Sequence, residues 1–278
     1  MNLKILIDDS VGLPNCMAEH GFSCFIEDDE AKVLFDLGYS GLFIKNANLM
    51  KIDVRFVTHV CFSHGHDDHT HGLLKWIHEF GYDLLKFKPK MLAHRNAFIQ
   101  KKAENEESGI GLDLDFIKTY FEVELANNPV LITNSLIFLG QIERTNNFEN
   151  KIPVGKTYDD SRNLVDDYCL DDSALIYKSS DGIVLITGCS HSGICNIIQY
   201  AIKIAKQYWN ETRIFSVLGG LHLLNPKRDL LEKTVNFLKS KDINTFYLGH
   251  CTDFESKAFM LNSGLNVKEI KVGCVFSF

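Results

Sequence analysis

SHGHDDH occupies residues 63–69, directly after an apolar run of strand length. Its pattern, H-x-H-x-D-H, brings three imidazoles and a carboxylate onto one tight turn. Alternate residues of an extended segment point the same way, so His64 and His66 can bind one ion. Asp68 and His69 begin the next helix and can face a second ion. Because imidazole nitrogen and carboxylate oxygen are donors that divalent first-row metals take, the stretch predicts a metal site rather than a solvated polar turn.

Three later histidines also follow apolar runs. His191 ends TGCSH at residues 187–191, His222 ends GGLH at 219–222, and His250 lies in GHC at 249–251. Taken singly, each is also compatible with a structural histidine, and the glycine pair before His222 with a plain turn. Together with residues 63–69, they place a histidine just past the end of four strands. One edge of a sheet would then collect all of them.

Short apolar runs separated by Gly, Asp and Asn predict a chain rich in strands. The expected strands are Leu3–Ile7, Phe22–Ile26, Val33–Phe35, Phe56–Phe62, Lys90–Ala93, Val130–Thr133, Ser135–Leu139, Ala174–Tyr177, Ile183–Thr187, Ile214–Leu218, Thr245–Leu248 and Val267–Phe278. Apolar residues at helical spacing predict helices at Gly72–Phe80, Asp113–Phe121, Ile194–Tyr208 and Asp229–Lys239.

The chain shows no clear linker, so we predict a single domain over residues 1–278. Residues 95–126 are polar and are expected to form either a lid or a contact between two copies in a homodimer. Residues 141–170 have no regular period, and a loop of about 30 residues is more often functional than idle. Its cations, Arg144, Lys151, Lys156 and Arg162, either meet a phosphate or carboxylate substrate or are simply solvated.

Composition excludes several classes of protein. With 45% hydrophobic and 23% charged residues, the chain of 278 residues has the make-up of a soluble globular protein. No uncharged apolar run approaches the roughly 18–20 residues of a membrane span, and Met1–Ser10 reads as a strand rather than a signal peptide. A net charge of −7 disfavours nucleic acid as a partner. We therefore expect a cytoplasmic protein with no membrane partner.

Eight cysteines include no C-x-x-C pair, so a structural zinc ribbon is not indicated. Without a secretory signal, disulfides are not expected either, and most of the thiols should be small buried hydrophobic groups.

The histidine pattern resembles the metallo-β-lactamase superfamily, which carries a strand, the string H-x-H-x-D-H and a helix. VLFDLG at residues 33–38 also resembles an early element of that family. GCSHSG at 188–193, GGLHL at 219–223 and HCT at 250–252 resemble one branch, the 7,8-dihydropterin-6-methyl-4-(β-D-ribofuranosyl)-aminobenzene-5′-phosphate synthase-like proteins. The resemblance implies an α+β fold, an αββα sandwich of two mixed sheets flanked by helices.

The resemblance also implies a set of ligands for two divalent ions, with zinc the default and iron, manganese or nickel alternatives. His64, His66 and His191 would bind the first ion, and Asp68, His69 and His250 the second. It further implies that Asp68 holds the attacking water and that His222 is the general acid, with direct metal ligation the alternative for His222.

Cys189 departs from the family pattern, because most members have the bridging aspartate of Thr-Gly-Asp at this position. Either Cys189 takes that place as a thiolate, or Asp171 or Asp172 supplies a carboxylate, or only one site fills. Asp36 is expected either to hydrogen-bond a ligand histidine or to be an ordinary turn aspartate. His71, His59, His20, His78 and His94 are expected to be structural, supporting or surface residues.

These observations predict an enzyme, a metal-dependent hydrolase that acts on a small phosphoester, lactone or related ester. The substrate is expected to be a small molecule, and phosphorylated compounds are among the candidates. A transferase or synthase of the branch type is the alternative, since the same metals serve either chemistry. A non-catalytic metal-binding sensor is the second alternative. A redox di-iron protein is disfavoured because His66 stands where such proteins have a carboxylate and no flavin segment is apparent.

Overall fold

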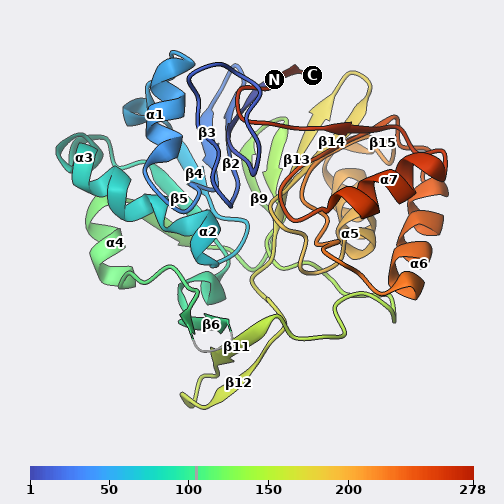
Figure 1. Cartoon of the computed structure of the whole chain (residues 1–278). Helices are drawn as coiled ribbons and strands as arrows, with labels where there is room; N and C mark the ends of the chain where they lie inside the picture. Colours follow the sequence, from blue (N-terminus) through green and yellow to red (C-terminus); the bar gives the residue numbers. More distant parts are fainter. Residues whose placement is uncertain (104–105) are drawn as a thin grey trace.

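Two mixed sheets pack face to face in the computed structural model, which describes residues 1–103 and 106–278. Helices cover the outer face of each sheet, so that the layers run helix, sheet, sheet, helix (Figure 1). The predicted αββα sandwich is therefore confirmed. The amino and carboxyl ends lie side by side at one edge, where the Met1 amino group donates a hydrogen bond to the Phe278 carbonyl oxygen.

The two sheets repeat one plan. The first has the order β18-β1-β2-β3-β4-β5-β8 and the second the order β17-β16-β15-β14-β13-β10-β9. In the first sheet, the strands from β18 to β3 are antiparallel neighbours and those from β3 to β8 are parallel. In the second, the strands from β9 to β14 are antiparallel and those from β14 to β17 are parallel.

The strands of the first sheet are β1 (Asn2–Ile7), β2 (Ser23–Glu27), β3 (Lys32–Phe35), β4 (His59–Cys61), β5 (Lys90–Ala93), β8 (Glu122–Leu125) and β18 (Val275–Ser277). Those of the second are β9 (Val130–Thr133), β10 (Leu136–Phe138), β13 (Ala174–Ser179), β14 (Gly182–Thr187), β15 (Ile214–Gly219), β16 (Thr245–Leu248) and β17 (Val267–Glu269).

The helices divide between the two sheets (Figure 1). Beside the first sheet lie α1 (Leu42–Leu49), α3 (Gly72–Phe87) and α4 (Leu114–Tyr120). Beside the second lie α5 (Ile194–Trp209), α6 (Arg228–Lys239) and α7 (Phe254–Asn262). A single-turn helix, α2 (Asp67–Thr70), follows β4, and 3₁₀ turns span Val54–Phe56 and Arg95–Phe98.

Alternation along the strands builds three apolar layers. In β14, Ile183 and Leu185 pack against the helices, while Val184 and Ile186 face the other sheet. This is the period of two that a strand buried on both faces imposes on its side chains. Each such side chain contributes roughly 1.5–3 kcal/mol by leaving water, so the two sheets are held together along their whole inner face.

A small third sheet involves the two segments that the sequence left undefined. β11 (Gly155–Tyr158) and β12 (Leu164–Asp167) form a hairpin within residues 141–170, so the expectation of a segment without regular structure was wrong. β11 pairs with β6 (Lys101–Ala103), which pairs with β7 (Glu106–Glu107). The remainder of 95–126 includes α4 and the edge strand β8, and these belong to the first sheet's layer.

Three other expectations differ from the structure. The strand expected over Val267–Phe278 is two short strands in different sheets, because Gly273 turns the chain with φ of 95°. The strand expected over Phe56–Phe62 shortens to β4 after a 3₁₀ turn. The helix expected to end at Phe80 continues to Phe87, although Phe80 itself has non-helical backbone torsions, and it ends before Pro89. Within residues 1–103 and 106–278, no helix combines the length and apolar character needed to cross a membrane.

Candidate metal centre

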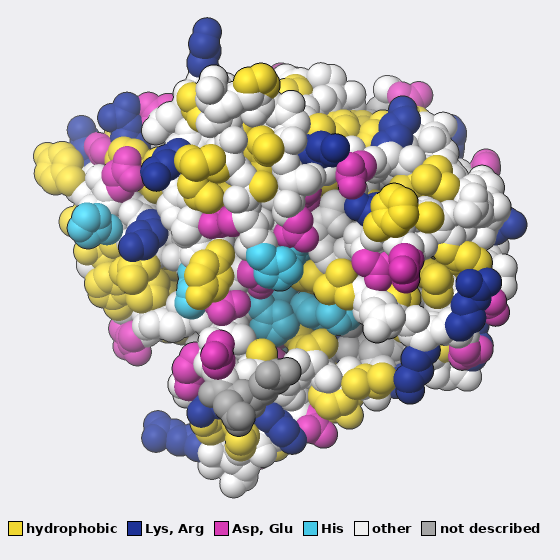
Figure 2. Space-filling model, viewed as in Figure 1, with side chains coloured by type: hydrophobic (Ala, Val, Ile, Leu, Met, Phe, Trp, Pro, Cys, Tyr) yellow, Lys and Arg dark blue, Asp and Glu magenta, His cyan; other side chains and the backbone are white. Residues whose placement is uncertain are grey.

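The carboxyl ends of four strands deliver the histidines to one place. β4 leads into residues 63–69, β14 into Cys189 and His191, β15 into His222, and β16 into His250. The backbone at Ala97 packs directly against Gly65, where any Cβ would collide with the Ala97 carbonyl oxygen. Figure 2 shows histidine side chains gathered in a hollow at the middle of one face.

His64, His66 and His191 form the first cluster of donors. His64 Nε2 lies 3.0 Å from His66 Nδ1 and 3.2 Å from His191 Nε2. Bonds of about 2.0–2.1 Å around a tetrahedral zinc ion place its nitrogen ligands about 3.3 Å apart, so the spacing suits an ion. Burial and the neighbouring imidazoles lower the pKa of His64 and His191 well below the usual value. Both rings are thus neutral, the form that ligates metals.

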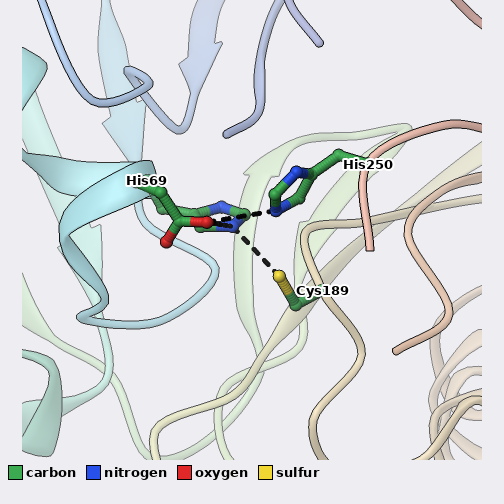
Figure 3. Close-up of side chains that lie close together, drawn as sticks. His69, Cys189 and His250 are labelled. Carbon is green, nitrogen blue, oxygen red and sulfur yellow. Dashed lines mark hydrogen bonds and ion pairs between the residues drawn. The ribbon is translucent and has the colours of Figure 1, made fainter. Parts of the chain in front are cut away.

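Asp68, His69, Cys189 and His250 form the second cluster. His250 Nε2 lies 3.2 Å from Asp68 Oδ2, and His69 Nε2 lies 3.7 Å from the same oxygen. Figure 3 shows His69, Cys189 and His250 pointing toward one another, with 3.1 Å between His69 Nε2 and Cys189 Sγ. Burial raises the pKa of Asp68, but His69 and His250 outweigh it and hold that pKa below its usual range. The carboxylate is therefore ionised and available as a ligand.

Further carboxylates orient the rings of the second cluster. Asp36 Oδ2 lies 2.7 Å from His69 Nδ1, and its carboxylate also accepts hydrogen bonds from the backbone N–H and hydroxyl of Ser63. Asp9 Oδ1 lies 2.9 Å from His250 Nδ1. A carboxylate on the outer nitrogen fixes which ring nitrogen faces the ion and makes it a better donor.

His222 lies beside the first cluster. Its ring centroid is 4.3 Å from that of His191, and its backbone has φ of 50°. Its buried Nδ1 has no hydrogen-bond partner among the described residues. The glycine pair before it permits a close approach, because a Cβ at Gly220 would lie 2.4 Å from the His250 carbonyl oxygen.

Asp171 and Asp172 are both buried but differ in their partners. Asp171 pairs with Lys101, 3.0 Å away, and accepts a hydrogen bond from the Gly65 N–H. Asp172 Oδ2 accepts a hydrogen bond from the Ser192 N–H, while its Oδ1 has no partner in the described part of the chain. Burial raises the pKa of Asp172 to about 6. Of the groups considered for the bridging position, Cys189 is the one that lies among the donors of the second cluster.

A cavity of about 650 Å³ opens beside His191 and His222. Its walls are largely apolar and include Phe148, Ile152, Leu221 and Leu224, with Lys151 and Lys227 also contributing. Its volume lies within the range of pockets that hold small organic ligands.

Other histidines lie outside the two clusters. His71 Nε2 contacts the Gly109 carbonyl oxygen, His94 caps the 3₁₀ turn that follows it, and His78 is exposed on α3. His20 is mostly exposed, yet its Nε2 lies 3.5 Å from Asp68 Oδ2. His59 is half-buried on β4.

Sequence reasoning missed several groups at the centre, namely Asp8, Asp9, Cys169 and Cys251, and the contact made by His20. Asp8 accepts a hydrogen bond from the His250 N–H, across 242 positions of the chain. No local pattern predicts such a contact. The position of Cys251, directly after a predicted ligand, was the signal that was available.

Comparison with known proteins gives consistent matches. The sequence profile of the metallo-beta-lactamase superfamily matches residues 18–195. An uncharacterized protein of Methanocaldococcus jannaschii is 32% identical over 91% of both chains. A second protein of that organism, named 7,8-dihydropterin-6-methyl-4-(beta-D-ribofuranosyl)-aminobenzene-5′-phosphate synthase, is 27% identical over 100% of this chain and 97% of its own length. A solved structure described as a metal-dependent hydrolase of the beta-lactamase superfamily has a TM-score of 0.81 and 29% identity, covering 100% of this chain and 99% of the other.

Proposed function

Because this chain belongs to the metallo-β-lactamase superfamily, we propose that it is a metal-dependent hydrolase acting on a small phosphoester, lactone or related ester. The observation that carries the proposal is the pair of donor clusters lying side by side next to a cavity. The ring centroids of His64 and His69, one from each cluster, are 4.3 Å apart. Two ions bound there would be near neighbours, as in dinuclear hydrolytic sites.

The donor set fits two divalent ions, zinc first, with iron or manganese as alternatives. When bound, such ions lower the pKa of a water molecule and polarise the carbonyl or phosphoryl oxygen of a substrate. His64, His66 and His191 would hold one ion, and Asp68, His69, Cys189 and His250 the other. The buried carboxylate of Asp36 would keep His69 in the tautomer that presents Nε2.

The chain's own residues would do the remaining work. Asp68, with its second oxygen, orients the attacking water by accepting a hydrogen bond from it. His222, at the boundary between the first cluster and the cavity, donates a proton to the leaving-group oxygen. The apolar cavity walls hold the organic part of the substrate, and Lys151 or Lys227 attracts an anionic group such as a phosphate.

A transferase or synthase reaction is the second candidate. The synthase from Methanocaldococcus jannaschii matches the full length of this chain, which favours it. The hydrolase described for the solved structure also matches the full length, at a similar identity. Both candidates use the same donors, so substrate assays must separate them.

The first experiment measures metal content per chain in protein purified without added metal. The variant His66→Ala removes a donor from the first cluster, and His78→Ala replaces an exposed histidine of α3 as a matched control. We expect two equivalents in the wild type and in His78→Ala, and fewer in His66→Ala. The rate of hydrolysis of chromogenic phosphodiesters and lactones should fall in His66→Ala together with its metal content.

Absence of bound metal, even after reconstitution, would refute the mechanism. Two bound metal ions per chain without hydrolysis of any ester would instead favour the synthase reaction.

A further inference from the structure

Cys251 is a buried thiol that the proposed site does not use. It follows His250 in the loop after β16, and its backbone has φ of 57°. Its Sγ lies 3.0 Å from Cys189 Sγ and 3.3 Å from His250 Nε2. The thiol therefore contacts two members of the second cluster directly.

The surroundings of Cys251 differ from those of an inert core cysteine. Cys61 lies in the apolar layer between the sheets, where burial raises the pKa of its thiol. Cys251 instead contacts Cys189 Sγ and His250 Nε2, both of them donor atoms of the second cluster. A thiol that lies among metal donors has the character of a ligand rather than of core packing.

The spacing of the donors also suits a shared ion. Around the second cluster, the nearest distances between donor atoms run from 3.0 Å for Cys189–Cys251 to 3.7 Å for Asp68–His69. Bonds of about 2.0–2.3 Å to a tetrahedral zinc ion place its nitrogen, oxygen and sulfur ligands about 3.3–3.8 Å apart. Small side-chain movements would therefore bring both sulfurs onto one ion.

We propose that Cys251 is a metal ligand which, together with Cys189, makes the second site a two-thiolate site for a thiophilic divalent cation. The inference rests on the proposed metal-dependent function and deepens it. Each thiol gives its proton to solvent as its sulfur–metal bond forms, so no oxidant or reductant is needed. Thiolate ligands favour zinc over manganese and other hard cations, so the pair narrows the choice of metal.

Cobalt(II) tests the inference, because a cobalt–thiolate bond produces a charge-transfer absorption in the near ultraviolet. The probe is Co²⁺ added to the metal-free, full-length protein. The variants are Cys251→Ser, Cys189→Ser and the double variant, with Cys274→Ser as a control at a half-buried cysteine outside the centre. We expect each single variant to lose about half of the band per bound Co²⁺, the double variant to lose all of it, and the control to retain it.

A full band in Cys251→Ser together with none in Cys189→Ser would overturn the inference while leaving the metal site intact. Failure of Co²⁺ and zinc to bind the wild type would instead refute the proposed function. Should Cys251→Ser not fold, Cys251→Ala gives the same readout: loss of about half of the band supports the pair, and a full band refutes it. A Cys189–Cys251 disulfide in the zinc-loaded protein would also overturn the inference.

Discussion

At the scale of single residues, the centre concentrates unfavourable backbone conformations. Asp36, Cys169, Ser190, His222 and Cys251 all have φ between 46° and 67°, a region that favours glycine and asparagine. Such conformations cost of order 1–3 kcal/mol each and persist where the surrounding contacts enforce them. Asp36 shows how: His69 Nδ1 and both the N–H and the hydroxyl of Ser63 contact its carboxylate.

His222→Asn tests the proposed role of His222 as proton donor. Asparagine tolerates the positive φ of this position but does not act as a general acid, so the fold and the metal content should be retained. Removing a general acid typically lowers kcat by about 10²–10⁴-fold when the leaving group is a basic alkoxide. Esters with a nitrophenolate leaving group should lose much less, because that group departs without a proton.

The measurement is the ratio of the activity on alkyl esters to the activity on nitrophenyl esters. His71→Gln is the control, because it replaces a nearby histidine whose ring contacts a backbone carbonyl oxygen. An equal loss on both kinds of ester, accompanied by loss of metal, would show that His222 is a ligand rather than the acid.

At the scale of elements, a buried ion pair links the small third sheet to the turn at residues 63–69, which carries candidate metal ligands. Lys101 of β6 is 2% exposed, and its Nζ lies 3.1 Å from Asp167 of β12 and 3.0 Å from Asp171. Asp171 in turn accepts a hydrogen bond from the N–H of Gly65, between the candidate ligands His64 and His66. The hairpin that the sequence did not predict therefore supports the turn that it did predict.

Lys101→Met should be strongly destabilising, because it leaves two buried carboxylates without their cation. Breaking a buried pair in this way costs about 3–5 kcal/mol. Lys102→Met is the matched control one position along the strand, where the lysine pairs with Glu107 at the surface and solvent screens the pair, so the variant should unfold almost as the wild type does. Urea unfolding measures both variants, and similar midpoints for the two would contradict the role given to Lys101.

The contrast between predicted and unpredicted elements has a physical basis. Strands such as Ile183–Thr187 can be recognised in the sequence because both of their faces are buried and nearly every residue is apolar. β11 and β12 are half exposed and polar, so their composition resembles that of a loop, and only their pairing with each other and with β6 makes them strands.

The same reasoning applies to the candidate site. Residues 63–69 are contiguous, so their donors can be recognised in sequence. Asp8 and Asp9 reach the centre only because the strand β1 ends beside the loop that carries His250, and His20 reaches it from the segment before β2, where it contacts Asp68. Contacts of this kind depend on the packing of the two sheets, which a single sequence does not display.

At the scale of the whole molecule, the donors come from both halves of the sandwich. The first sheet contributes His64, His66, Asp68 and His69 through the turn after β4. The second contributes Cys189 and His191 after β14, and His250 after β16. Bound ions would therefore tie the two sheets together at the edge where their strands end, in addition to the apolar layer between them.

Metal removal should therefore lower the stability of the whole fold rather than of one loop. A ligand that binds only the folded state stabilises it by about 4 kcal/mol when its free concentration is 1,000 times its Kd. We expect the zinc-loaded protein to unfold in one transition, several degrees above the chelator-treated protein, when followed by circular dichroism. Zinc should raise the unfolding temperature of His78→Ala as much as that of the wild type. It should raise the unfolding temperature of His66→Ala less, because this variant lacks a donor. If the loaded and stripped proteins unfold at the same temperature, the ions do not join the two halves.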